Sequence, residues 1–307
     1  MALHLGEADV AALLSPADAV DAVERCFERL ARGAVDDRPR YRLETDVGRL
    51  AVMAAADREL GFAGSKTYAT GPHGARFVVV LFEGDELAAV IEADKLGQLR
   101  TGAASGVAAR HLARPGARSL GVIGCGWQAE SQVECIRAAL PAIERSVAFC
   151  PNEERLADFC GRLRTEPAES HREAAEQDVV VTITTSRDPV LRGEWLRPGA
   201  LVCAAGANDP AKRELDNVVL ERAAFVCVDS RENARVESAD VFEPVEQGVL
   251  DWLEVHELAQ VVAGETAGRA DPEDIVVFKS NGLAAWDVAV GALAVERARE
   301  RGVGRSL

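Results

Sequence analysis

Residues 119–130 read Ser-Leu-Gly-Val-Ile-Gly-Cys-Gly-Trp-Gln-Ala-Glu, and this stretch decides the fold. An apolar run leads into a Gly-x-Gly-x-x-Ala pattern, and a helix-compatible segment follows over 130–140. A strand, a tight glycine turn and a helix N-terminus in this order bind the pyrophosphate of a dinucleotide, because the exposed N–H groups and the helix dipole attract phosphate. The alternative is a glycine turn that only lets a helix pack closely on a strand. The predicted cofactor contacts are Gly124, Gly126, Trp127, Gln128 and Ala129.

The composition is that of an ordinary globular protein, with 28% charged and 48% hydrophobic residues among 307. The formal net charge of -15 argues against a nucleic-acid or anionic-membrane partner, whose phosphates would be repelled. No apolar run approaches the roughly 20 residues of a membrane span, and the N-terminus does not resemble a signal peptide. The seven cysteines and five histidines are scattered without metal-ligand spacing. We therefore expect a cytoplasmic protein with buried, reduced thiols and no metal site.

The first third of the chain predicts a mixed α+β region. A helix is expected over 16–32, because Ser15-Pro16 is a helix-start signal and apolar residues recur behind it at helical spacing. Strand-like runs occur at 49–56 and 76–91, the latter with a turn at 83–85 that indicates a hairpin. An alanine-rich helix is expected over 101–113, and the break Arg114-Pro115-Gly116 marks a domain boundary.

Beyond that break, strands and helices alternate as in a doubly wound parallel sheet. The final segment, 282–301, reads as one long helix that returns to the first domain. The predicted class is α/β, with a Rossmann sheet over 116–281 and a discontinuous α+β domain built from 1–115 and 282–307. The predicted strands of the sheet are 119–123, 146–150, 178–184, 200–205, 225–228 and 275–279.

Six sequence blocks, in order along nearly the whole chain, resemble the ornithine cyclodeaminase/μ-crystallin family. The block at Leu99–Ser105 is especially specific, because it combines Arg-Thr-Gly-Ala with a following His-Leu-Ala. The blocks are Arg40 to Met53, Gly64-Ser65-Lys66-Thr67, Leu99–Ser105 with His111-Leu112-Ala113, Ile123–Ala129, Gly206–Leu215 and Val277–Asp287.

The resemblance implies a homodimer of subunits that each carry a Rossmann domain and a discontinuous substrate and dimerisation domain. Family members bind NAD(H) or NADP(H) and act on small amino acids, 2-oxo acids or cyclic imines. Their activities include cyclisation of ornithine to proline, dehydrogenation of alanine, and reduction of ketimines such as pyrroline-2-carboxylate.

The resemblance also assigns roles to three cationic residues. Arg40 and Arg100 match the residues that clamp the substrate carboxylate, a task suited to the planar guanidinium fork. Arg38 and Arg42 compete with Arg40 for that assignment. Lys66 matches the active-site lysine, which could hold a carboxylate or carbonyl, or exchange a proton if burial and cationic neighbours lower its pKa.

Two positions depart from the cyclodeaminase pattern. Asn208 stands where cyclodeaminases carry an acid, and Ala51 stands where they carry Glu. Asn can hydrogen-bond a substrate amine but cannot take a proton, and neighbouring Asp209 would point elsewhere. Both departures favour a dehydrogenase or imine reductase, in which Asn208 orients the substrate nitrogen and Lys66 or water supplies the proton.

The end of the second predicted strand bears on the choice of cofactor. NAD enzymes usually carry an acid there that binds the ribose 2′-hydroxyl, and this chain has Cys150-Pro151-Asn152 instead. Arg155 could contact a 2′-phosphate, whereas Glu153 and Glu154 would oppose it. We therefore favour NADP(H) over NAD(H), with contacts from Pro151, Asn152 and Arg155.

Other candidate cofactor contacts follow later strands, whose carboxyl ends face the cofactor in such sheets. The hydroxyls of residues 184–186 either line the nicotinamide side or belong to a strand-end turn. Asp287, inside the final helix, is expected to have a packing role. The remaining predicted cofactor contacts are Thr101, Thr184, Thr185, Ser186, Gly206 and Ser280.

The sequence therefore predicts an NAD(P)(H)-dependent oxidoreductase that acts on the C–N bond of a small amino or imino acid, with 2-oxo acids among its possible substrates in the presence of an amine. One alternative is ornithine cyclodeaminase, which regenerates its NAD and releases ammonia. A second is a non-catalytic, crystallin-like protein that binds a cofactor or another ligand. Retention of Arg40, Lys66 and Arg100 argues against the second alternative.

Overall fold

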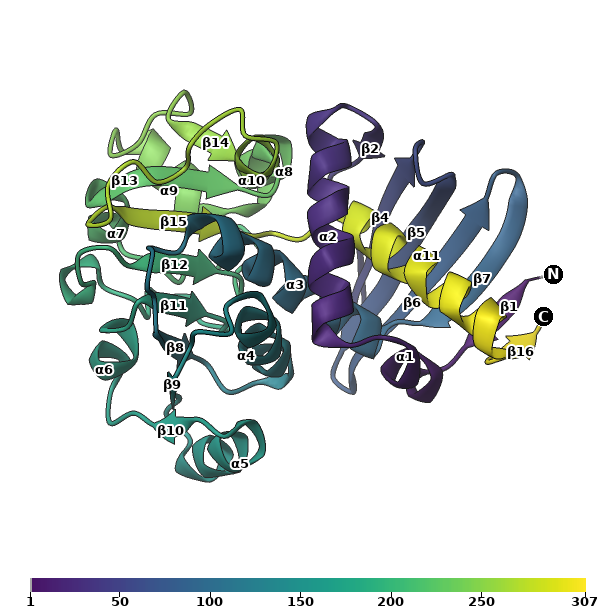
Figure 1. Ribbon diagram of the computed structural model, residues 1–307, viewed down its shortest axis with the longest axis horizontal. Coiled ribbons are helices and arrows are strands. Elements are labelled where there is room, and N and C mark those ends of the chain that lie inside the picture. The colour runs from purple at the N-terminus through teal and green to yellow at the C-terminus, as the bar shows by residue number, and fades with distance from the viewer. Residues whose placement is uncertain (1) are drawn as a thin grey trace. The chain divides into compact units, whose positions relative to one another are not determined.

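The computed structural model describes residues 2–307, which divide into two compact units. Unit 1 contains the chain up to Arg100 together with Leu283–Leu307, and unit 2 contains Thr101–Gly282. Figure 1 shows the C-terminal helix, in yellow, on the sheet formed by the purple and blue N-terminal strands. The final helix thus returns to the first unit, and that unit is discontinuous in sequence.

Unit 1 is built on an eight-stranded sheet that is antiparallel except where β1 pairs with β7. The strand β3 (Tyr41–Thr45) pairs only with β4. The order is β16 (Arg305–Ser306), β1 (Leu3–Leu5), β7 (Glu86–Glu92), β6 (Gly74–Glu83), β5 (Phe62–Gly71), β4 (Gly48–Asp57) and β2 (Val35–Asp37).

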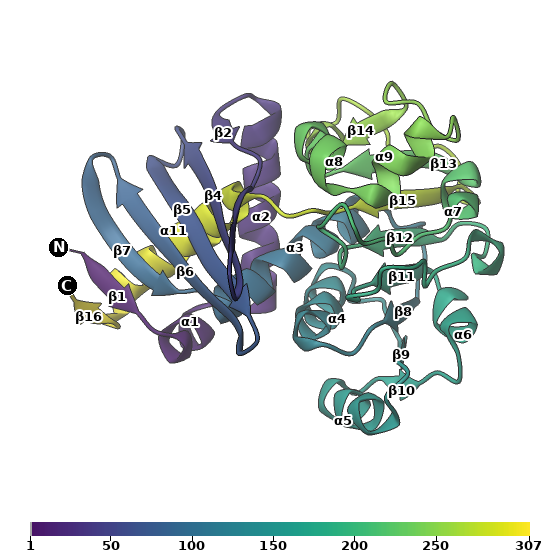
Figure 2. The same ribbon diagram turned by 180° about the vertical axis from the view of Figure 1, so that it is seen from behind.

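Two long helices, α2 (Pro16–Ala31) and α11 (Ala284–Arg301), cover one face of this sheet (Figures 1 and 2). The predicted start of α2 is confirmed, because the Ser15 hydroxyl accepts the Asp18 N–H at 3.2 Å. The Asp18 carboxylate in turn accepts the Ser15 N–H at 3.0 Å, which completes a capping box. The short helix α1 (Glu7–Leu13) precedes α2, and α3 (Asp94–Leu112) leads out of unit 1 into unit 2.

Two glycines let α11 lie close to the sheet. A Cβ at Gly64 of β5 would come within 2.6 Å of Leu81 Cδ2, and one at Gly291 of α11 within 2.8 Å of Leu81 Cδ1. Leu81 of β6 is fully buried and fills the space that both glycines leave open. This leucine therefore joins the sheet to its covering helix.

Unit 2 is an eight-stranded, wholly parallel sheet. Its strand order reverses between β8 and β11, and ligands bind at such switch points, beyond the carboxyl ends of the strands. The order is β10 (Glu166–Pro167), β9 (Arg145–Phe149), β8 (Ser119–Ile123), β11 (Val179–Thr182), β12 (Leu201–Ala204), β15 (Ile275–Lys279), β13 (Ala223–Val228) and β14 (Val255–Glu257). Its other helices are α4 (Trp127–Ala139), α5 (Glu153–Leu163), α6 (His171–Ala175), η1 (Gly193–Trp195), α7 (Asn217–Glu221), α8 (Arg231–Glu237), α9 (Ala239–Glu246) and α10 (Leu258–Val262).

The predicted α/β class is confirmed, and all six predicted strands of the parallel sheet are present within one or two residues of their expected ends. The helix expected over 101–113 already begins at Asp94, and the helix after the glycine turn begins at Trp127. The central strand β5 was not predicted. It contains Gly64, Ser65 and two alanines, which carry little strand signal, and it is held by β4 on one side and β6 on the other.

Residues 101–115, which the sequence analysis assigns to the first domain, cluster with unit 2. Gln132 donates to the carbonyl of Thr101, and Arg114 donates to Asp178 with Nε–Oδ1 at 3.0 Å. Gly102 lies so close to Ser131 that a Cβ there would overlap the Ser131 backbone. These contacts attach most of α3 to unit 2. The domain boundary at 115–116 stays a prediction.

We expect Leu81→Ala to lower the free energy of unfolding by about 2–5 kcal/mol, because it opens a cavity between β6 and α11. Adding Gly291→Ala should recover part of this loss, since the new methyl enters the space that Leu81 occupied. Urea denaturation measures both effects. Leu253→Ala, at a site where the side chain is 83% exposed, is the control and should change stability by less than about 0.5 kcal/mol. Equal losses in the single and double variants would contradict this packing.

Candidate functional site

A buried cluster of charges lies in unit 1 beneath α11. Lys66 Nζ is 3.0 Å from Asp287 Oδ1, and Arg100 Nε is 3.3 Å from the same oxygen. The Lys66 and Asp287 side chains are only 3% and 1% exposed. One carboxylate oxygen thus holds two cations that lie far apart in sequence.

Local structure explains how Lys66 reaches this position. It lies on β5 opposite Met53 of β4 and Val79 of β6, both of which are buried, so its side chain points to the face that α11 covers. Gly97 at the start of α3 leaves room for the ammonium, because a Cβ there would come within 2.7 Å of Lys66 Nζ. The Phe77 ring lies beneath the ammonium, with its centroid 5.2 Å from Nζ.

The surroundings lower the pKa of Lys66 to about 8. Burial is the largest cause, and the charges of Arg100 and Arg40 act in the same direction, whereas Asp287 opposes them. Arg40 is itself buried, in the segment between β2 and β3. The cluster therefore combines three cationic side chains with the Asp287 carboxylate, an arrangement suited to binding the carboxylate of a small acid.

Asp287 is the functional residue that sequence reasoning missed. It was expected to have a packing role, but it is the counter-ion of Lys66 and Arg100. The available signal was an acid among apolar residues in the first turn of α11, next to Trp286, whose ring lies 5.8 Å from the Arg100 guanidinium carbon. A buried acid in an apolar stretch of helix needs a cationic partner.

In unit 2, the glycine turn after β8 has the geometry that a dinucleotide needs. Gly124 has a φ of +113°, and a Cβ there would overlap the Ile183 carbonyl oxygen. A Cβ at Gly126 would meet no atom within 4 Å, so the turn is open at the point where phosphate approaches. Gly126 is also the N-cap of α4 and offers that helix no side-chain cap. Ala129 is fully buried. These features fit a dinucleotide pyrophosphate at the N-terminus of α4.

The segment after β9 presents its predicted cofactor residues at the surface. Pro151, Asn152 and Arg155 are all exposed. Asn152 caps α5, because its Oδ1 accepts the Arg155 N–H at 2.8 Å. The amide oxygen of Asn152 is therefore engaged, and the Arg155 guanidinium is the group in this segment that could meet a phosphate.

The hydroxyl groups of unit 2 that were predicted to contact the cofactor mostly form hydrogen bonds within the protein. Thr184 Oγ1 donates to Glu214 at 2.8 Å, Ser186 Oγ donates to the Asp188 carbonyl at 2.7 Å, and Ser280 Oγ donates to Asp229 at 3.1 Å. Thr185 is exposed. These hydroxyls order the strand ends, and their assignment to the cofactor stays a prediction.

Asn208, the predicted nitrogen-orienting residue, follows β12 and is partly exposed. Behind it lies a second buried charge cluster, formed by Glu214, Asp240 and Lys279, that sequence reasoning missed. Lys279 Nζ is 3.3 Å from Asp240 Oδ2. Burial raises the pKa of Glu214 above its usual value, while the Lys279 charge and hydrogen bonds from Thr184 lower it.

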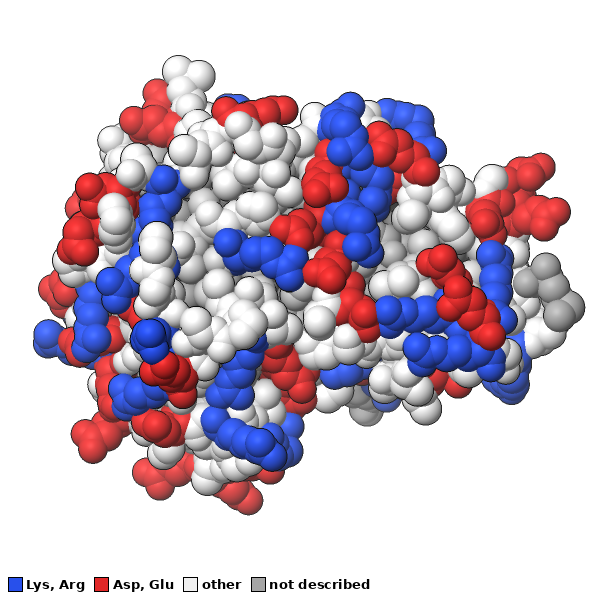
Figure 3. All heavy atoms as spheres, in the orientation of Figure 1, with Lys and Arg blue, Asp and Glu red and all other residues white. Residues whose placement is uncertain are grey.

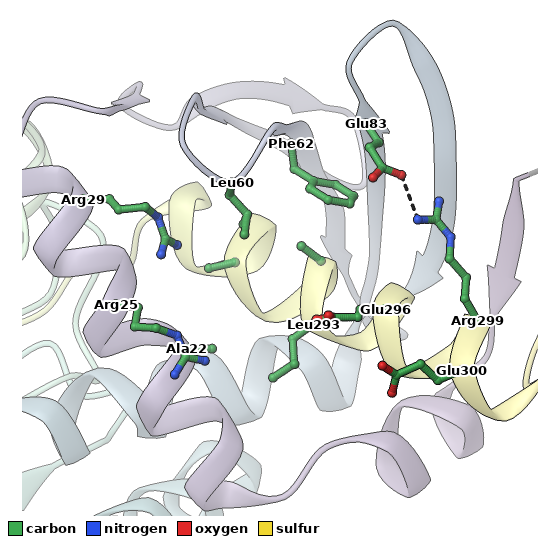
Figure 4. Close-up of a pocket in the computed structure, with 12 residues that line it drawn as sticks. Ala22, Arg25, Arg29, Leu60, Phe62, Glu83, Leu293, Glu296, Arg299 and Glu300 are labelled. Carbon is green, nitrogen blue, oxygen red and sulfur yellow. Dashed lines mark hydrogen bonds and ion pairs between the residues drawn. The ribbon is translucent and has the colours of Figure 1, made fainter.

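A cavity of about 500 Å³ in unit 1 lies apart from these groups (Figure 4). Arg25 and Arg29 of α2 line one side of it, and an ion pair between Arg299 and Glu83 lies at the other. None of its lining residues belongs to the Lys66 cluster. This cavity is therefore not the place where the predicted substrate clamp lies.

A dinucleotide turn at the switch point of a parallel sheet and a buried lysine–arginine cluster define the class as a nicotinamide-dependent oxidoreductase. Residues 3–302 match the profile of the ornithine cyclodeaminase/mu-crystallin family, and the chain belongs to that family. It is an NAD(P)-dependent oxidoreductase that acts on a C–N bond.

Three relatives illustrate the match. The alanine dehydrogenase of Archaeoglobus fulgidus is 35% identical over 327 residues, which cover 99% of this chain and 98% of that protein. The structure of Thermococcus litoralis Δ1-pyrroline-2-carboxylate reductase with NADH and L-proline superposes with a TM-score of 0.94 at 31% identity, over 99% of this chain and 100% of that one. An archaeal alanine dehydrogenase dimer with bound NAD gives a TM-score of 0.93 at 34% identity, over 100% and 98% of the two chains.

We expect Asp287→Asn to lower the pKa of Lys66 below its value of about 8, because the carboxylate is the group that raises it. NMR titration of protein labelled at lysine Cε measures this pKa, and a spectrum of Lys66→Arg assigns the signal. Lys212, outside the cluster, is the internal control, and the substitution should leave its NMR signal unchanged. An unchanged or higher pKa for Lys66 would show that Asp287 does not act as its counter-ion.

Proposed function

We propose that the protein is an imine reductase or amino-acid dehydrogenase for a small substrate with an α-carboxylate. The observation that carries this proposal is the pairing of buried Lys66 and Arg100 through Asp287, with Arg40 close enough to lower the Lys66 pKa. Asn208 in place of an acid supports hydride chemistry over deamination, because an amide cannot accept a proton. The names of the relatives, an alanine dehydrogenase and a pyrroline-2-carboxylate reductase, agree with this substrate class.

In the proposed mechanism, Arg40 and Arg100 bind the substrate carboxylate. A nicotinamide cofactor held at the turn of Gly124 and Gly126 would supply hydride chemistry at the substrate α-carbon. Lys66, whose pKa of about 8 lies near neutrality, transfers a proton, directly or through water. Asn208 donates to or accepts from the substrate nitrogen and so orients it. Holding the reactants in one geometry lowers the activation free energy by roughly 7–11 kcal/mol.

For the cofactor, we propose a preference for NADP(H) over NAD(H). The segment after β9 has no acid where NAD enzymes place one, and the Arg155 side chain is exposed at the start of α5. Glu153 and Glu154 beside it act in the opposite direction. The solved relatives were obtained with NADH and NAD, so the preference rests on this chain's own residues.

We also propose a homodimer formed through the sheet of unit 1. The face of the sheet opposite α11 carries apolar side chains. Two examples are the cross-strand pairs Tyr41 with Val52 and Phe82 with Leu87. Tyr41 is 65% and Phe82 42% exposed in the single chain. An apolar sheet face of this kind calls for a partner, and one relative is described as a dimer.

The expected absence of a nucleic-acid partner rests on charge. The net charge is -15, and on the face drawn in Figure 3 acidic and basic side chains are intermixed rather than gathered into a basic patch. No helix of residues 2–307 is long and apolar enough to span a membrane. A cytoplasmic location stays a prediction.

Absorbance at the nicotinamide band tests the proposed function. The purified protein is mixed with NADPH or NADH and with cyclic imines, or with 2-oxo acids plus ammonia or methylamine. Oxidation of the cofactor supports the proposal, and a faster rate at low NADPH supports the NADP preference. Ornithine with NAD is assayed in parallel. Ammonia release without a net absorbance change would instead identify a cyclodeaminase, and tight cofactor binding without any turnover a non-catalytic binding protein.

We expect Lys66→Ala to lower kcat at least a hundredfold, because proton transfer and part of the carboxylate site are lost together. The Kd for NADPH, measured by fluorescence, should change less than threefold, since the glycine turn is untouched. The matched control is Lys95→Ala, which should keep near-normal kcat. A near-normal kcat for Lys66→Ala would remove Lys66 from the mechanism.

We expect Phe82→Asp to shift the protein from dimer to monomer, because it places a charge within an apolar interface. Light scattering after size-exclusion chromatography measures the mass. Leu253→Asp, an exposed leucine of unit 2, is the control and should leave the dimer intact. A monomeric wild-type protein would contradict the proposed assembly.

A further inference from the structure

The buried carboxylate of Glu214 gathers two strand-end segments of unit 2. Its Oε1 accepts the N–H and the hydroxyl of Thr184, at 2.7 and 2.8 Å. Its Oε2 accepts the N–H of Gly206 at 2.8 Å, the N–H of Ala207 at 3.1 Å and the hydroxyl of Thr182 at 3.1 Å. One side chain thus joins the ends of β11 and β12, the segments that face the ligand in such sheets.

Lys279 and Asp240 hold the same segment from the other side. The Lys279 ammonium donates to the carbonyls of Ala204 and Ala207, and pairs with Asp240. The other oxygen of Asp240 accepts the N–H groups of Glu214 and Leu215, at 2.8 and 2.9 Å. The loop from Ala205 to Leu215 is therefore fixed at both of its ends.

The contacts converge on the residue before Asn208. Glu214 binds the N–H of Ala207, and Lys279 binds its carbonyl, which belongs to the peptide bond joining Ala207 to Asn208. Gly206 permits this approach, since a Cβ there would overlap the backbone nitrogen of Thr184. Two fully buried charged side chains therefore hold the two consecutive peptide planes that lead into Asn208, Glu214 the Gly206–Ala207 plane and Lys279 the Ala207–Asn208 plane.

The pattern of donors requires a carboxylate at position 214. Both oxygens of Glu214 face hydrogen-bond donors, and both act as acceptors. A glutamine would place an NH₂ group, which only donates, against one of these donor sets. Glu214→Gln keeps size and shape but leaves buried donors facing each other.

We propose that Glu214, supported by Lys279 and Asp240, is the positioning residue that fixes the backbone leading into Asn208, so that Asn208 meets the substrate nitrogen. This inference rests on the proposed role of Asn208. Glu214 is not itself a reacting group. It acts by ordering the loop, and its contribution passes through Asn208.

Glu214→Gln is compared with wild type by two independent measurements. Hydrogen exchange followed by mass spectrometry should show faster exchange in peptides covering residues 204–209, because a glutamine cannot accept from both donor sets at once and so holds the N–H groups of Gly206 and Ala207 less firmly. Steady-state kinetics should show kcat lowered at least tenfold, with the Kd for NADPH changed less than threefold. Glu243→Gln is the matched control, because the partly exposed Glu243 carboxylate pairs with Arg213 and takes part in none of the hydrogen bonds described above, and it should change neither quantity.

A double-variant comparison tests the route through Asn208. Adding Glu214→Gln to Asn208→Ala should cause little further loss of kcat if both act as one unit. If the two single-variant losses of kcat instead multiply in the double variant, the proposal is overturned. It is also overturned if Glu214→Gln lowers the melting temperature but leaves kcat and the exchange over 204–209 unchanged. If Glu214→Gln does not fold, Thr182→Val is the second variant, because it removes one hydrogen-bond donor to Glu214 without changing the size of the side chain. It should raise hydrogen exchange over 204–209 and lower kcat two- to fivefold. No change in either quantity would overturn the proposal.

The tests separate this inference from the proposed function. If wild type turns over no imine or amino acid, the proposed function fails while the exchange result still decides whether Glu214 orders the loop. If Asn208→Ala keeps full kcat, the role of Asn208 fails, and the inference that Glu214 works through it fails with it. Wild-type turnover with a defective Asn208→Ala and a normal Glu214→Gln overturns the positioning role alone.

Discussion

The arrangement of unit 1 depends on one buried ion cluster, in which Asp287 Oδ1 meets both Lys66 and Arg100. A buried charge is costly without a partner, so neither cation would stay in this position without the carboxylate. The cost is met by bringing the first turn of α11 against β5 and α3. The ion cluster thus adds to the apolar packing that holds the C-terminal helix on a sheet built by the N-terminal part of the chain.

The same physical device recurs in unit 2, where buried carboxylates order the ends of strands. Glu214 joins the segments after β11 and β12, and Asp229 accepts the N–H groups of Asn281 and Gly282 after β15, at 2.7 and 2.6 Å. Burial raises the pKa of Asp229, and these hydrogen bonds lower it again. A carboxylate can accept several N–H groups at once, which suits it to fix irregular backbone where regular pairing ends.

The sequence predicted those features that depend on local pattern. The glycine turn at Gly124 and the parallel strands are encoded by short-range periodicity and by residues that the backbone itself requires. Lys66 and Arg100 were identified through family blocks, and the structure brings both to one carboxylate. The pattern did not reveal β5, because glycines, Ser65 and two alanines interrupt its strand-forming residues, and pairing with β4 and β6 completes the strand. Nor could it reveal Asp287 and Glu214 as partners, because contacts over 221 or 32 residues of separation leave no local signal.

The two departures from the cyclodeaminase pattern affect the chemistry differently. Ala51 is buried on β4, two residues from Met53, the partner of Lys66, so the small side chain removes an acid from the face that carries the cluster. Without an acid at position 51, Asp287 is the carboxylate that raises the pKa of Lys66. The excess of cationic side chains in the cluster favours an anionic group on the substrate. Asn208 removes a proton acceptor but keeps a polar group that can hold nitrogen. Under the proposed function, the first change leaves three cationic side chains around one carboxylate in unit 1, with Lys66 as the group whose pKa suits proton transfer.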